Sequence, residues 1–91
     1  KMIYIEYDLT LPDTSVTKYH KVHEISYDKL TNEYTVIVGS WFTLEDIARN
    51  KRPRATFNVP FGQSLNMENP LLELLIPKLG WDEQKAIIKE L

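Results

Sequence analysis

The segment from Tyr19 to Pro60 places the strongest constraint on the fold, because it joins two strand-like runs, a short helix and a third strand in order. Apolar residues recur at every second position from Tyr34 to Val38, the period expected of a strand. Residues 28–32 before this run are typical of a five-residue hairpin loop. The segment therefore predicts a compact antiparallel sheet, and nothing in it is typical of an active site.

A short helix is predicted from about Leu44 to Arg49. Thr43 is a good N-cap, and the two acidic residues of the first turn complement the helix dipole. Pro53 prevents the helix from continuing. Residues 54–61 alternate again and predict a strand, and Pro60 near its end indicates an edge position in the sheet.

One further strand is predicted before this segment, and it forms a hairpin with the first strand of the segment. Residues 2–11 show the cleanest alternation in the chain, and residues 12–15 are typical of a turn. Between Val16 and Tyr27 the alternation is weaker, but β-branched and aromatic residues still favour a strand over a helix. We therefore expect four antiparallel strands in sequential order.

The last third of the chain is predicted to be helical. Asn69 and Pro70 suit an N-cap and the first helical position, and residues 71–76 are apolar on most sides of the helix. Pro77 is expected to end or kink this helix, and Gly80 is a plausible C-cap. The leucine-rich run is consistent with burial against the sheet or with an interface, and the sequence alone leaves both possibilities open.

Residues 81–91 predict a short last helix, with its apolar side chains on one side. The chain thus predicts one α+β domain over residues 1–91. Residues 1–61 are expected to form a small antiparallel four-stranded β-meander with a short helix between strands 3 and 4. Residues 66–91 are expected to form one or two C-terminal helices packed on the sheet.

The composition is that of an ordinary soluble globular protein, with 43% apolar and 26% charged residues. No apolar run approaches the roughly 20 residues of a spanning helix, and the N-terminus lacks the apolar core of a signal peptide. We therefore expect a soluble chain without a transmembrane segment. Basic residues outnumber acidic ones between residues 42 and 61, whereas both ends are acidic. This polarity favours charge-complementary contacts with a neighbour or between copies.

The sequence offers little catalytic machinery. His20, His23 and Glu24 invite a metal site, but strand positions three apart point to opposite faces, so the two imidazoles should not converge. The chain has no cysteine and only three glycines, which rules out a thiolate site and both common nucleotide-binding loops. No nucleophile elbow is present either. We expect no enzyme activity, no cofactor, no metal site and no small-molecule substrate.

Two runs are candidates for contact with a partner. The first is a cluster of basic residues in the connection after the short helix, and the second is the leucine-rich run. The predicted partner-binding residues are Arg49, Lys51, Arg52, Arg54, Leu71, Leu72 and Leu75. The basic cluster also supports an alternative function, a small nucleic-acid-binding domain, although the pI near 5.6 argues against it.

The order of residues in this part of the chain resembles a group of small accessory proteins encoded among the tail genes of tailed bacteriophages. The resemblance covers residues 16–60, and residues 69–91 do not follow it. Its motifs are Tyr19-His20-x-Val22, Asp28 in a loop, Val36-x-Val38-x-Ser40-Trp41 and Lys51-x-Pro53.

The resemblance implies a non-enzymatic virion component of the tail, baseplate or collar. Such a protein is assembled in the host cytoplasm. It would contact other virion proteins or copies of itself as a homo-oligomer, and it would contact no membrane.

Overall fold

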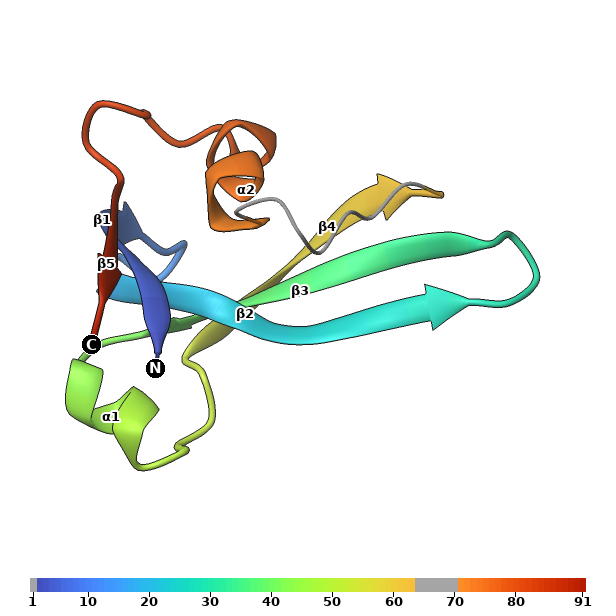
Figure 1. Ribbon diagram of the computed structural model, residues 1–91. Coiled ribbons are helices and arrows are strands. Elements are labelled where there is room, and N and C mark those ends of the chain that lie inside the picture. Colours follow the sequence, from blue (N-terminus) through green and yellow to red (C-terminus); the bar gives the residue numbers. More distant parts are fainter. Residues whose placement is uncertain (1, 64–70) are drawn as a thin grey trace.

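The computed structural model describes residues 2–63 and 71–91, with only the backbone of Leu71, and contains five strands and two helices among them (Figure 1). In chain order the elements are β1 (Ile3–Thr10), β2 (Val16–Asp28), β3 (Glu33–Trp41), α1 (Leu44–Ala48), β4 (Ala55–Gly62), α2 (Leu71–Leu79) and β5 (Ile87–Glu90). The strands form one antiparallel sheet in the order β4-β3-β2-β1-β5. The α+β class is confirmed, and the first four strands are neighbours in sequential order as predicted.

The predicted strand number and the predicted last helix are both wrong. Residues 87–90 form β5, which pairs with β1 and makes the sheet five-stranded. In this segment Ile88 is half-buried against the core while Ile87 is exposed, so burial alternates with the period of a strand. An isolated helix as short as the one predicted over residues 81–91 gains little from its own hydrogen bonds. The edge of β1, in contrast, offers backbone donors and acceptors that residues 87–90 can pair with.

The weak alternation of β2 has a specific cause, a β-bulge at His23. Val22 pairs with Val38 and Glu24 pairs with Ile37, so His23 of β2 has no pairing partner on β3. The bulge reverses the faces of all later residues: His20 and Val22 face the same side as Val38, but beyond the bulge this side receives Ile25. A single period-two pattern therefore cannot fit the whole strand.

The helix α2 covers one face of the sheet and forms the core with it. Leu72, Leu75 and Ile76 are buried together with Trp81 and with side chains from β1, β3 and β4: Ile5, Val36, Val38 and Val59. The helix continues through Pro77 and ends before Gly80, which has a φ of 76°. The C-cap is therefore confirmed, while the predicted N-cap at Asn69 and Pro70 lies outside the described residues.

The opposite face carries α1 and Trp41. The hydroxyl of Thr43 accepts a hydrogen bond from the Asp46 amide at 3.1 Å, which confirms the predicted cap. Trp41 is buried and lies across Gly39, where a Cβ would come within 2.5 Å of the indole ring. Glycine is thus required at this position because the ring occupies the space of a side chain.

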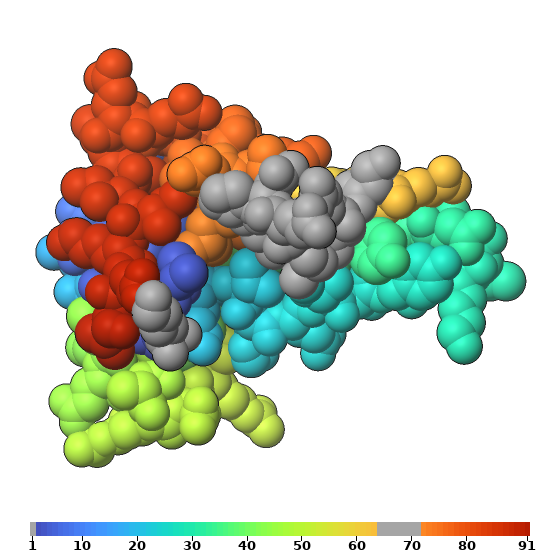
Figure 2. All heavy atoms as spheres, viewed as in Figure 1, coloured from blue at the N-terminus to red at the C-terminus, as the bar shows by residue number. Residues whose placement is uncertain are grey.

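The sheet has two parts of different width. All five strands lie side by side near Ile5 and His20, but β1 and β5 do not extend along the rest of β2. The hairpin of residues 24–37, here called the arm, therefore projects to one side of the body with β4 alongside β3 (Figures 1 and 2). Strand β4 is at the edge of the sheet, as Pro60 predicted.

Candidate protein-docking surfaces

The basic cluster is largely neutralised by neighbouring acids. Arg49 pairs with Glu45 at 2.7 Å and Lys51 pairs with Asp46 at 3.4 Å, both across α1 and its C-terminal connection. Arg54 forms an ion pair with Asp13 from the turn after β1. Among the described residues no carboxylate lies within ion-pair distance of Arg52. The cluster therefore presents one unpaired cation rather than four, which weakens it as a phosphate-binding surface.

The leucine-rich run belongs mostly to the core. Leu75 is fully buried and Leu72 nearly so, while Leu74 is partly exposed. Nothing is described of the Leu71 side chain. Burial in the core accounts for Leu72 and Leu75 without a partner.

His20 is a buried histidine with both ring nitrogens occupied. Nε2 lies 2.7 Å from the carbonyl oxygen of Tyr7, and Nδ1 lies 2.6 Å from the hydroxyl of Ser40. Because a carbonyl only accepts, Nε2–H donates, and Nδ1 of the neutral ring accepts from Ser40. The ring also packs 4.5 Å from Trp81, which stacks on Tyr7 at 4.8 Å. Burial lowers the pKa of His20, and the Tyr7 carbonyl and Asp8 oppose this shift only in part.

The two histidines do not converge. His23 is exposed at the bulge and forms a T-shaped pair with Trp41, with the ring centroids 6.0 Å apart, on the face opposite to His20. Within residues 2–63 and 71–91 no group of three or more His, Asp or Glu side chains could hold a metal ion.

The arm exposes apolar side chains that the sequence analysis did not single out. The register places Ile25, Tyr27 and Tyr34 on the face that α2 covers nearer the body. The rings of Tyr27 and Tyr34 lie 4.8 Å apart, and 46% of Tyr27 remains exposed. Leu30 at the tip is 94% exposed. Apart from Ile37, the other face is polar and acidic, with Glu24, Ser26, Asp28, Glu33 and Thr35.

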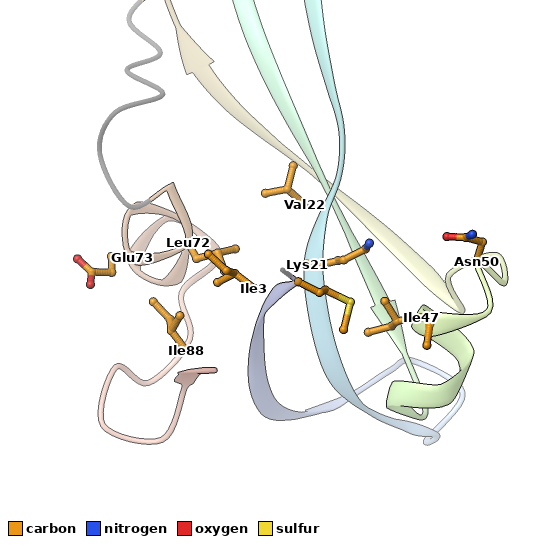
Figure 3. Close-up of a pocket in the computed structure, with 10 residues that line it drawn as sticks. Ile3, Lys21, Val22, Ile47, Asn50, Leu72, Glu73 and Ile88 are labelled. Atoms are coloured by element: carbon orange, nitrogen blue, oxygen red, sulfur yellow. The ribbon is translucent and has the colours of Figure 1, made fainter. Parts of the chain in front are cut away.

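A groove of about 610 Å³, here called the notch, lies where β1 begins beside β2 (Figure 3). On the α2 side its lining residues are Ile3, Val22, Leu72, Glu73 and Ile88; on the α1 side they are Met2, Lys21, Ile47, Ala48 and Asn50. The notch thus has mostly apolar walls on both faces of the sheet. The notch was not predicted from the sequence, because its residues come from five separate elements and residues 87–90 were expected to be helical.

No helix among the described residues is long and apolar enough to cross a bilayer. Comparison with models of known protein families, with curated proteins and with solved structures found no match to this chain.

Proposed function

We propose that this chain is a non-enzymatic structural protein that acts through protein–protein contacts, as a component of a phage tail, baseplate or collar. The observation that supports this function most strongly is the arm. A single exposed leucine is common on protein surfaces, but here Leu30 lies at the tip of an arm that also carries Ile25, Tyr27 and Tyr34 on one face. Exposed apolar patches of this kind are typical of interaction sites.

The polar groups of the core support a structural role as well. The buried polar side chains among the described residues are Thr17, His20 and Ser40. His20 and Ser40 bond each other, and His20 is closed off by Trp81. A general base must reach a substrate proton directly or through one water, and His20 is fully buried.

The virion assignment is supported by the resemblance to phage tail-associated accessory proteins. Its motifs fall on β2, β3 and the connection between α1 and β4. These elements include the arm, so the part of the chain that resembles those proteins also contains the proposed contact surface.

The test is self-association of the purified chain, measured by size-exclusion chromatography with light scattering and by negative-stain imaging. We expect a defined oligomer or ring. The double variant Tyr27→Ser/Leu30→Ser should remain monomeric, because it removes the apolar contacts of the arm, while its thermal unfolding should stay close to that of the wild type. Lys29→Ser is the matched control in the same loop and should associate normally. A wild-type chain that stays monomeric at every concentration and binds no purified virion protein would contradict the proposal.

The alternative, nucleic-acid binding by residues 49–54, rests on Arg52 as the unpaired cation of the cluster. We expect no retention of DNA or RNA at low salt. Retention that falls steeply with salt and is lost in Arg52→Ala would favour the alternative instead.

A further inference from the structure

We propose that the free edge of β2, together with the notch, binds an extended, basic segment of a partner protein by strand addition. This inference deepens the proposed function and rests on it for the partner being a protein. It concerns a different surface from the apolar face of the arm.

The first argument is the sheet register. β2 spans 13 residues, but its pairing with β1 runs only from Val16 to His20. From Val22 to Asp28 it pairs with β3 on one side, and no strand of the described residues pairs with it on the other. Such an edge presents a row of backbone donors and acceptors that an extended chain satisfies best.

The second argument is the shape of the notch at the start of this edge. Successive side chains of a strand point to opposite faces of the sheet. The notch offers an apolar wall on each face, with Leu72 and Ile88 on one side and Ile47 and Ala48 on the other (Figure 3). Ile3 in the notch is 51% exposed. An added strand in line with β1 would therefore bury apolar side chains on both faces.

The third argument is charge. Glu24 and Asp28 lie along the free edge, Glu33 lies opposite Asp28, and Glu73 lines the notch. None of these four carboxylates forms an ion pair with a described residue. Two lysines lie near the same edge: Lys21 in the notch, 5.9 Å from the Trp41 ring, and the exposed Lys29, which follows Asp28. The four carboxylates outnumber these two cations, so the net charge around the edge is acidic, which favours Lys or Arg in the partner segment.

The other two edges of the sheet suit strand addition less well. β5 has only four residues, and β4 contains Pro60. Short edge strands and edge prolines are both features that discourage pairing with another chain. β2 has no proline, so its free half is the edge best suited to a partner strand.

The experiment uses the untagged full chain and a synthetic library of peptides of about seven residues, a common strand length. The peptides alternate Val, Ile or Phe with Lys, Ser or Thr. Binding is measured by titration, and amide hydrogen exchange of the chain is followed by NMR. We expect slower exchange in Val22–Asp28 on binding. Peptides N-methylated on the amides that face β2 should not bind, whereas those methylated on the opposite edge should.

Two variants test the notch and the charge. Ala48→Lys places a long charged side chain on the exposed apolar wall formed by α1, and we expect about tenfold weaker binding, equivalent to about 1.4 kcal/mol. Glu73→Lys should weaken the binding of lysine-containing peptides. Asn58→Glu on exposed β4 is the control and should bind normally.

No binding of any library peptide would overturn the inference, as would protection that appears in β4 or β5 instead of Val22–Asp28. Both results are distinguishable from failure of the proposed function. If the chain self-associates through the arm but binds no peptide, strand addition is wrong and the structural role stands. If it binds peptides at β2 but neither associates nor binds virion proteins, the proposed role is wrong.

Discussion

At the scale of single residues, His20 connects the sheet to the loop after α2. Its ring bonds to Tyr7 and Ser40 and packs on Trp81, so β1, β2, β3 and the C-terminal segment meet at one imidazole. The sequence predicted a strand at this position, and His20 lies in β2. The hydrogen bonds of His20 were not predictable, because its partners are 13 and 20 residues away.

The neutral form of His20 should make folding stability depend on pH. Its pKa is lowered in the folded state, so the unfolded chain binds more protons below the ordinary value of 6.5. The stabilisation is complete above pH 6.5 and is lost as pH falls through the folded pKa, by at most about 1.4 kcal/mol per pH unit.

Urea unfolding at several pH values checks this prediction. The contribution of His20 should disappear in His20→Gln and remain in His23→Gln, in which only the exposed histidine is changed. An identical pH dependence in all three proteins would exclude His20 as its source.

Replacement of the buried Thr17 by valine should increase the stability of the fold. Its hydroxyl is buried and has no hydrogen-bond partner among the described residues. Valine has nearly the same shape and no polar atom to desolvate, so Thr17→Val should stabilise the fold by about 1 kcal/mol. The exposed Thr56→Val is the matched control and should change the unfolding free energy by less than about 0.5 kcal/mol. Destabilisation by Thr17→Val would mean that the hydroxyl has a partner.

At the scale of elements, residue types with a local effect on the backbone predicted where helices begin and end and which strand lies at an edge. Thr43 capped α1, Gly80 ended α2, and Pro60 marked an edge strand. The failures concern tertiary pairing. β5 forms because β1 offers a free edge beside it, and the bulge at His23 forms where two strands must keep their apolar residues on the α2 side. Both features depend on a neighbouring strand, so the residues of β5 or of β2 alone do not predict them.

The strand assignment of residues 87–90 can be tested by two neighbouring isoleucines. Ile88 packs against the core, whereas Ile87 is 50% exposed. We expect Ile88→Ala to lower the unfolding free energy by about 1–3 kcal/mol and Ile87→Ala by less than about 0.5 kcal/mol. Similar losses in both variants, measured by urea unfolding, would contradict the alternating burial of a strand.

At the scale of the whole molecule, neither the arm nor the notch was predictable from the sequence. The arm exists because β1 covers only the first part of β2, and the notch exists because the same strand starts where β2 continues. Strand lengths were predicted approximately, but their relative register was not, and register determines which edge is left free.

Because β3 is paired on both sides and the outer half of β2 on only one, their backbone amides should differ in protection from hydrogen exchange. In the chain without peptide, we expect slow exchange throughout Val36–Ser40. In Val22–Asp28 the amides that face β3 should exchange slowly and the others fast. Uniform protection of Val22–Asp28 would show that this edge is already covered, and would remove the premise of strand addition.

Met2, which lines the notch, lies beside Leu91, since the Leu91 amide donates to the Met2 carbonyl at 2.8 Å. A fusion partner attached to either end therefore emerges beside Ile3 and Ile88, far from Leu30 at the arm tip. Tagged protein suits experiments on the arm, whereas the notch must be studied after tag removal. The same proximity makes the chain a candidate for circular permutation, with a short linker joining the old ends and new ends opened elsewhere.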